Sequence, residues 1–401
     1  LGDVYKRQIR TVLNFIKGIL VLVVLGSLIN KYLFQKFQLG YKSFLLGSVI
    51  VLFGAYCSSQ SDYYYHILKI SQRGWEGEIY KEDKKLGYAN VAHFSGFRNV
   101  PLLPKQPTFT DENGMRVAQT TAINNNADTS ILFLGCSFTF GDACIAEETF
   151  SYKVGDKTNY KTYNAGVCGY GIAQMLLKGE ALIPTLQPQY VVVQYSPWLT
   201  ERSIYPFSPN LVGKVPTPIA RVEHDSLVIT SPIFKPLVFQ LHVNKFIPGP
   251  KSLAQYFRFY CTVGLPLAIH DNYKVLIYRV KEKLGKIKLQ NVNQKNEVPL
   301  KAYEKLKNVC LLNNSKLIVL ALGTETNDEV LSFLKQDATI QVIDAEATLW
   351  DKLIESNQDN YDKAYKHWAT ENNISYMVDE HPNAKAHDII AEEIVKAIKT
   401  K

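Results

Sequence analysis

Short apolar runs alternate with helical patterns in two separate stretches of the chain. In the first stretch, Ile131–Leu134 and Tyr190–Val193 predict buried strands, and the β-branched, unalternating second run is typical of a strand covered on both faces. Residues 160–163 predict a further strand between them. A helical pattern with apolar positions at Ile172 and Leu176 follows that strand.

The second stretch repeats the pattern near the C-terminus. Helices are predicted at residues 302–312, 328–335 and 384–399, and strands at 317–322 and 340–343. Strands that alternate with helices are typical of a parallel sheet covered on both sides. The sequence therefore predicts an α/β fold, a three-layer α/β/α sandwich with a mostly parallel sheet, divided into a first part (129–200) and a second part (297–401).

The segments around this pattern have other compositions. Residues 61–128 are polar and are predicted to form an irregular lead-in with turns. Residues 201–296 break the alternation and are rich in proline, aromatic and β-forming residues, including Leu227–Thr230. We interpret 201–296 as an insertion over the carboxyl edge of the sheet, where such folds bind ligands.

The N-terminal region contains two apolar stretches within residues 9–60. Residues 11–29 are long enough to span a bilayer, and residues 40–59 form a second candidate span. We favour a transmembrane hairpin over a single anchor or a buried soluble hairpin. Lysines in the connection favour a cytoplasmic loop, which would place the large domain outside the membrane. Residues 1–8 resemble a translated sequencing adaptor and are excluded from this inference.

The distribution of charge along the chain is typical of a membrane-associated N-terminus and not of a nucleic-acid-binding domain. Residues 1–42 hold seven Lys/Arg against Asp3, a net charge of +6, which leaves about +2 of the total +8 for the remaining 359 residues. A nucleic-acid binder needs its positive charge on the folded part, so no nucleic-acid partner is expected. The six cysteines lack metal-binding spacing, and most are expected to be buried. A Cys144–Cys168 disulfide remains an alternative for an extracytoplasmic domain.

Two short segments carry residues suited to acyl transfer. Gly135-Cys136-Ser137 follows a predicted strand directly, so the Ser137 hydroxyl would be exposed beside backbone N–H groups that can hold an oxyanion. Asp379-Glu380-His381 lies just before the last helix, and an Asp two residues before a His can orient its ring. Each segment alone is typical of an ordinary turn.

Together the two segments resemble the SGNH (GDSL-type) hydrolase superfamily. Its nucleophile block matches Leu134–Gly141, its last block matches Asp379, His381 and Asn383, and its second block matches Gly166. The resemblance covers about 110–200 and 300–399. It implies a flavodoxin-like sandwich, a Ser137–His381–Asp379 triad, and an oxyanion hole made by the N–H groups of Ser137 and Gly166.

The chain departs from that family pattern at two positions. Cys136 replaces the usual Asp beside the nucleophile, and the third block has no Asn for the oxyanion hole. Gln194 or Ser196 is expected to donate instead. Losing one such donor typically lowers turnover by ~10²–10³.

The resemblance implies a membrane-anchored esterase or O-acyltransferase that acts on an ester, such as an O-acetyl group, of a cell-envelope glycan or lipid without metal or organic cofactor. The alternative is a catalytically weak protein of the same fold that binds envelope glycan or an acyltransferase partner.

Other candidate residues carry less weight. They are Cys136 as nucleophile, His387 as a surface or packing residue, His242 and His270 beside the cleft, and Glu147 and Glu148 in a first helical turn.

Overall fold

The computed structural model describes one compact part of the chain. The described residues are 74–77, 79–100, 102–119, 128–205, 217–232, 294–325 and 327–400, with the single positions 47, 277, 280, 281 and 284. Nearly all of them belong to the unit formed by Ile70–Phe246 and Lys288–Lys401. Among them no helix is both long and apolar enough to cross a bilayer. The predicted spans within 9–60 lie outside the described residues, apart from Gly47.

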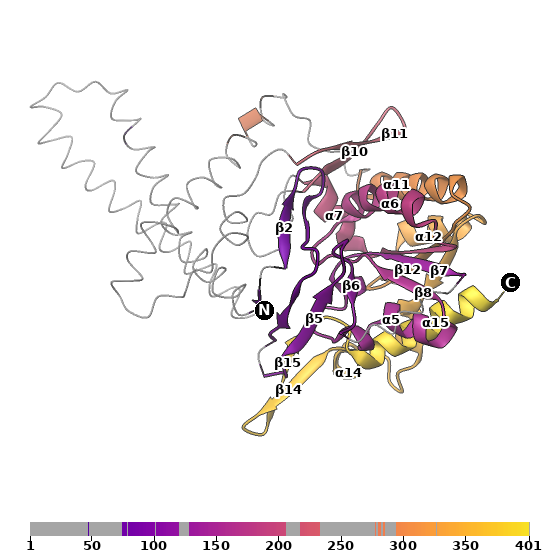
Figure 1. The fold of residues 1–401 in the computed structure, drawn as a ribbon. Helices are drawn as coiled ribbons and strands as arrows, with labels where there is room; N and C mark the ends of the chain where they lie inside the picture. Colours follow the sequence, from indigo (N-terminus) through magenta and orange to yellow (C-terminus); the bar gives the residue numbers. More distant parts are fainter. Residues whose placement is uncertain are drawn as a thin grey trace, which may run out of the picture. The chain divides into compact units, whose positions relative to one another are not determined.

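A nine-stranded sheet forms the centre of this unit, in the order β1-β4-β5-β6-β8-β7-β9-β12-β13 (Figure 1). Five neighbouring strands are parallel, which confirms the predicted core of the fold. They are β8 (Lys161–Asn164), β7 (Ser130–Leu134), β9 (Tyr190–Tyr195), β12 (Lys316–Ala321) and β13 (Gln341–Asp344).

The other four strands come from the lead-in and pair antiparallel. They are β1 (Trp75–Glu76), β4 (Ser95–Arg98), β5 (Gln106–Thr110) and β6 (Arg116–Val117), and β2 (Tyr80–Asp83) and β3 (Gly87–Asn90) form a separate hairpin. The prediction of an irregular lead-in was wrong. These strands are short, two to five residues each, and every one contains at least one position that is only partly buried, so they lack the long apolar runs of the central strands.

Helices cover both faces of the parallel strands, so the predicted three layers are present. Alternate strand residues face opposite sides: Leu132 and Val193 pack with the helices of one layer, and Phe133 and Ile318 with those of the other. The first layer contains α6 (Ile172–Leu186), α7 (Pro197–Ile204), α11 (Gln294–Leu312) and α12 (Glu329–Gln336). The second contains α5 (Phe150–Thr158), α13 (Ala345–Asp351), α14 (Gln358–Tyr365) and α15 (Ala384–Lys399).

Shorter elements complete the unit. They are the one-turn helix α4 (Ser137–Phe140), the 3-10 turn η2 (Ala146–Glu148), the hairpin of β10 (Ile219–Glu223) with β11 (Ser226–Thr230), and the hairpin of β14 (His367–Glu371) with β15 (Ile374–Asp379). The described part of the predicted insertion is the end of α7, the β10–β11 hairpin, which packs against α7 and α11, and the start of α11. Apart from the single positions 277, 280, 281 and 284, the rest of 201–296 lies outside the described residues.

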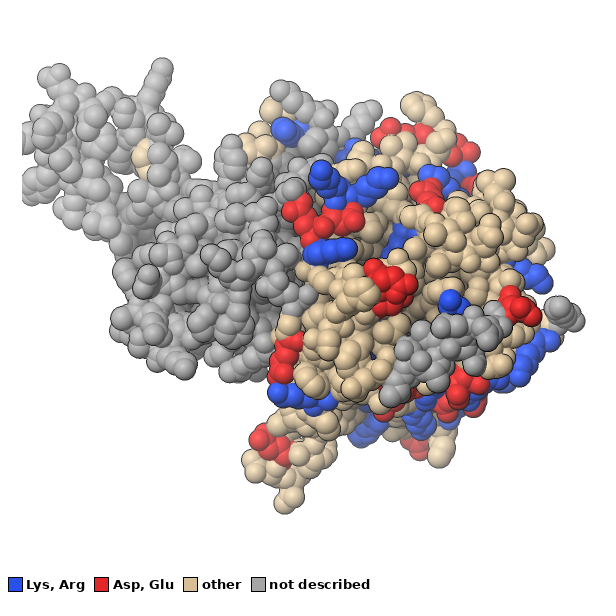
Figure 2. Space-filling model, in the orientation of Figure 1, with Lys and Arg blue, Asp and Glu red and all other residues tan. Residues whose placement is uncertain are grey.

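The surface charge of this unit is mixed. Figure 2 shows Lys and Arg side chains interspersed with Asp and Glu over the visible face of the described residues. Between α5 and α15, Lys153 and Lys157 pair with Asp388, and Lys157 also pairs with Glu392. Solvent-accessible pairs of this kind contribute little to stability, so the packing of the two helix layers on the sheet holds the unit together.

Candidate active site

Ser137 is the first residue of α4, directly after the turn that ends β7. The turn requires glycine at Gly135, because an added Cβ would lie 1.8 Å from Thr139 Oγ1 and 2.8 Å from Gln194 Oε1. Gly141 ends α4 with a φ of 79°, a conformation that favours glycine. The sequence between the two glycines is thereby folded into a single helical turn. Ser137 is 7% exposed, and its hydroxyl lies 3.8 Å from Cys136 Sγ.

Gln194 fastens this turn from the neighbouring strand β9. Its Oε1 accepts hydrogen bonds from the Cys136 N–H (3.1 Å) and the Thr139 hydroxyl (2.9 Å). Its Nε2 donates to Ser196 Oγ (2.9 Å) and lies 3.2 Å from Cys136 Sγ. Both Gln194 and Ser196 are buried. The contacts of the Gln194 amide are therefore made beneath the nucleophile turn.

Asp379 and His381 form a short hydrogen bond. Asp379 Oδ1 lies 2.5 Å from His381 Nδ1 and also accepts the His381 backbone N–H at 2.9 Å. Asp379 ends β15, and Asn383 caps α15 by accepting the N–H groups of Lys385 and Ala386. Because the loop is fixed at both ends, the His381 ring is oriented by its own segment. The ring lies against the nucleophile turn, with its centroid 5.6 Å from that of Phe138.

A second carboxylate, Asp142, faces the other nitrogen of His381. Asp142 Oδ2 lies 4.0 Å from His381 Nε2. Arg98 of β4 joins the two carboxylates, with its Nε 2.6 Å from Asp142 Oδ1 and an Nη 3.7 Å from Asp379 Oδ2. Trp75 lies beside Arg98, whose guanidinium carbon is 5.5 Å from the ring centroid. The imidazole therefore lies between two carboxylates that share one guanidinium.

This arrangement sets the protonation of the site. Burial disfavours the charge of Asp379, but hydrogen bonds from His381 and the nearby Arg98 outweigh it and lower the Asp379 pKa to about 2. Burial likewise opposes the charge of His381, but Asp379 and the Asp142 charge outweigh it and raise the His381 pKa. For Asp142, burial is outweighed by Arg98 and by His381, so its pKa is lowered. Both carboxylates are thus ionised at neutral pH.

Not all the predicted site residues converge in the structure. Within the described part of the chain, no hydrogen bond joins the Ser137 hydroxyl to His381. The Gly166 N–H donates to Asn164 Oδ1 at 3.1 Å, and Gly166 packs tightly on the backbone of Thr139 and Phe140. Ser137 is the first residue of α4, and among the described residues no acceptor is hydrogen-bonded to its backbone N–H. Serine–histidine contacts are often loose without substrate and tighten when it binds.

Sequence reasoning missed Asp142 and Arg98. Asp142 carried a usable signal, since it follows the glycine that ends the nucleophile block. Arg98 carried none, because the strand that holds it lies far upstream in a region predicted to be irregular.

The remaining candidates lie elsewhere or have structural roles. His387 is fully buried, its Nδ1 accepts the Phe150 N–H at 3.2 Å, and its ring packs on Phe150, so of the two expected roles it has the packing role and not the surface one. Cys144 and Cys168 are free thiols, so the alternative disulfide is not formed. Glu147 and Glu148 lie in η2, just before α5. His242 and His270 lie outside the described residues.

Comparisons with known proteins give matches among solved structures. No protein-family model matches the chain, and no curated protein matches it. A putative lipolytic protein of the G-D-S-L family from Desulfitobacterium hafniense DCB-2 matches with a TM-score of 0.32 and 13% identity, over 67% of this chain and 99% of that chain.

Two further solved structures match a similar share of this chain. TesA matches with a TM-score of 0.34 and 10% identity, over 68% of this chain and 98% of that chain. A catalytic mutant of Axe2, an acetylxylan esterase from Geobacillus stearothermophilus, matches with a TM-score of 0.34 and 11% identity, over 69% of this chain and 96% of that chain.

Proposed function

We propose that this chain is a serine esterase of the SGNH type, with Ser137 as nucleophile, His381 as general base and Asp379 as its orienting carboxylate. The observation that carries the proposal is the 2.5 Å bond between Asp379 and His381 Nδ1. With Nδ1 held as the donor, Nε2 is left as an acceptor, on a ring that already lies against the turn of Ser137.

The proposed reaction uses only side chains and backbone of the chain. Ser137 Oγ forms a bond to the acyl carbonyl carbon while its proton passes to His381 Nε2, and the Ser137 N–H stabilises the resulting oxyanion. The ester C–O bond then breaks, and the alcohol leaves with the proton from His381. Water, or the hydroxyl of an acceptor, repeats the sequence on the acyl-enzyme and releases Ser137. The first outcome is hydrolysis and the second is O-acyl transfer.

The proposed substrate is an acyl ester, most simply an O-acetyl ester, of a cell-envelope glycan or lipid. It follows from the proposed anchoring of residues 9–60 in the membrane, with the catalytic unit on the extracytoplasmic side. A topology reporter fused after residue 62 tests this placement. A cytoplasmic signal would exclude a cell-envelope substrate and would leave the esterase proposal unaffected.

A fluorophosphonate probe tests the nucleophile, because it labels a serine only when a base activates it. The full-length chain should be labelled, and Ser137→Ala should lose the label. Ser375→Ala, which removes an exposed hydroxyl in β15, is the matched control and should keep it. Labelling that persists in a folded Ser137→Ala protein, or its absence from the parent chain, contradicts the proposal.

A second candidate function has specific support. The Gly166 N–H is already used by Asn164, the amides of Gln194 are used beneath the turn, and Ser137 is not hydrogen-bonded to His381. These contacts favour a catalytically weak protein of the same fold that binds envelope glycan or an acyltransferase partner. If the folded full-length chain takes no probe and cleaves no 4-nitrophenyl acetate, this second function is favoured. If it does, product analysis with and without a sugar acceptor separates transferase from hydrolase.

A further inference from the structure

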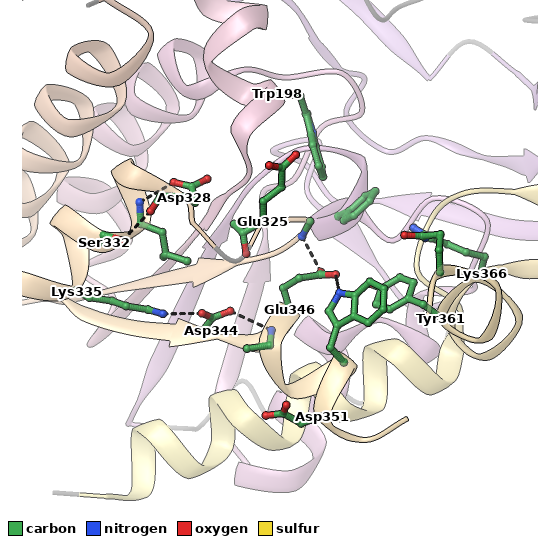
Figure 3. Close-up of a pocket in the computed structure, with 17 residues that line it drawn as sticks. Trp198, Glu325, Asp328, Ser332, Lys335, Asp344, Glu346, Asp351, Tyr361 and Lys366 are labelled. Carbon is green, nitrogen blue, oxygen red and sulfur yellow. Dashed lines mark hydrogen bonds and ion pairs between the residues drawn. The ribbon is translucent and has the colours of Figure 1, made fainter. Parts of the chain in front are cut away.

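A cavity of about 710 Å³, shown in Figure 3, has Phe138 of the nucleophile turn in its wall. It is bounded by the segments that follow β9, β12 and β13, at residues 198, 323–325 and 346–351. These strands are parallel to β7, so their carboxyl ends and Ser137 share one edge of the sheet.

Phe138 connects the cavity to the candidate active site. Its ring centroid lies 5.4 Å from that of Trp198, which lines the cavity, and 5.6 Å from that of His381. Phe138 also directly follows Ser137. A molecule in the cavity therefore packs against a side chain that touches the proposed base.

The walls of the cavity combine flat rings with charged groups. Trp198 and Phe138 line one part and Trp350 another, where Trp350 stacks on Tyr361 at 4.6 Å. Lys366 lies 5.6 Å from the ring centroids of both Phe138 and Tyr361. In the described part of the chain no carboxylate pairs with Lys366, so its ammonium group can donate to a ligand.

Three of the five acidic side chains in the walls are already engaged. Asp328 accepts the Tyr195 hydroxyl, Asp344 pairs with Lys335, and Glu346 accepts the Gly323 N–H and the Trp350 indole N–H. Among the described residues no donor or cation contacts the carboxylates of Glu325 and Asp351, which are exposed. Figure 3 shows Glu325 beside Trp198. The cavity thus offers unpaired acceptors, an unpaired donor and aromatic faces.

We propose that this cavity binds a sugar residue that forms the alcohol part of the ester. Sugar hydroxyls both donate and accept hydrogen bonds, and the C–H face of a pyranose ring packs on an aromatic side chain, so each kind of group in the walls has a counterpart. An acyl chain would offer no hydrogen-bonding partner to Glu325, Asp351 or Lys366. The inference rests on the proposed esterase function and selects a glycan ester over a lipid ester.

Kinetics with three esters test the inference on the full-length chain. The probes are mono-O-acetylglucose, monooctanoylglycerol and 4-nitrophenyl acetate. We expect acetylglucose to be preferred to monooctanoylglycerol. We also expect Glu325→Ala and Asp351→Ala each to lower the ratio of kcat/KM for acetylglucose to that for 4-nitrophenyl acetate by about 3- to 10-fold, the size of one lost exposed hydrogen bond.

Asp359→Ala is the matched control, because Asp359 is an exposed carboxylate on α14 that pairs with Lys363 and does not line the cavity. Its ratio should not change. Unchanged ratios in both cavity variants, or preference for monooctanoylglycerol, would overturn the inference while leaving the esterase standing. Failure of the esterase itself appears separately, as fluorophosphonate labelling or 4-nitrophenyl acetate cleavage that survives Ser137→Ala.

A binding measurement needs no turnover. Titration of Ser137→Ala with cellotetraose should quench tryptophan fluorescence saturably, since Trp198 and Trp350 line the cavity. The Glu325→Ala/Asp351→Ala pair in the same background should weaken this binding about 10-fold or more. An equal affinity with and without the two carboxylates contradicts the proposed site.

Discussion

Asp142 Oδ2 lies 4.0 Å from His381 Nε2, the nitrogen that must receive the Ser137 proton. Asp379 holds the opposite nitrogen, so His381 is flanked by a carboxylate on each side. A carboxylate facing Nε2 stabilises the protonated ring, which favours the imidazolium formed during acyl transfer and also keeps the resting base protonated to higher pH. The position of Asp142 should therefore be visible in the pH dependence of turnover.

Asp142→Asn should move the acid limb of the pH profile to lower pH. Because Asp142 raises the His381 pKa, removing its charge lets His381 lose its proton at lower pH and act as a base there. The measurement is kcat/KM for 4-nitrophenyl acetate across pH 5 to 9, roughly the range in which histidines titrate. Asp388→Asn removes a half-exposed carboxylate on α15 and serves as the control. An acid limb that stays in place, or moves upward, contradicts this role.

Arg98→Met should destabilise the folded unit by ~2–4 kcal/mol near neutral pH, since it leaves two largely buried carboxylates without their shared cation. The loss should be smaller in acid, where protonation relieves the repulsion. Denaturant unfolding at pH 7 and pH 4 measures both. Arg98→Met/Asp142→Asn should recover much of the stability. An additive double variant would mean that the two side chains are not coupled.

Gln194→Met should lower stability by ~1–3 kcal/mol, because the Cys136 N–H and the Thr139 hydroxyl lose a buried acceptor. A residue that acted only as an oxyanion donor would lower kcat with little change in unfolding. Urea unfolding and kcat, measured on the same preparation, separate the two roles. Gln189→Met, which removes an exposed side-chain amide that precedes β9 and accepts the Ser130 N–H, is the comparison variant.

His387→Asn should make the protein less sensitive to acid. Burial lowers the His387 pKa to about 3, far below its value in the unfolded chain. The unfolded state therefore binds the extra proton, and stability falls by up to ~1.4 kcal/mol per pH unit as the pH drops from about 6.5 toward 3. Asparagine keeps an acceptor for the Phe150 N–H without this titration. Unfolding free energies at pH 7, 5 and 4 should show a flatter slope in the variant, and an unchanged slope would exclude His387 as the source.

The parallel half of the fold could be predicted because its strands are buried on both faces. Runs such as Val191–Val193 and Leu317–Leu320 are apolar throughout, and the predicted strand and helix positions differ from the structure mainly at their ends. The helix predicted at 302–312 begins earlier in the structure, at Gln294. Its first turns were missed because they are polar and contain Pro299. The β14–β15 hairpin was missed because most of its positions are at least partly exposed, which leaves no burial signal in the sequence.

In the candidate site, too, contacts between residues close in sequence could be predicted and long-range contacts could not. Ser137 and the Asp379–His381 pair could be found because each depends on neighbours close in sequence: a strand end, a two-residue spacing and a helix cap. The pairing of Arg98 with Asp142 depends on long-range strand order, which places β4 beside β5 and brings the lead-in to the nucleophile turn. The use of Gln194 beneath the turn depends in the same way on the pairing of β7 with β9.

The antiparallel strands of the lead-in have a consequence for any chimera made from this chain. Because β4 carries Arg98 and β6 pairs directly with β8, a recombination point near residue 128 would divide one sheet and separate a guanidinium from its two carboxylates. A graft that transfers the nucleophile block and the histidine loop without residues 74–119 would therefore move the reacting groups but lose their charge balance. The transplantable unit begins with the strand at Trp75, well before the first apolar strand.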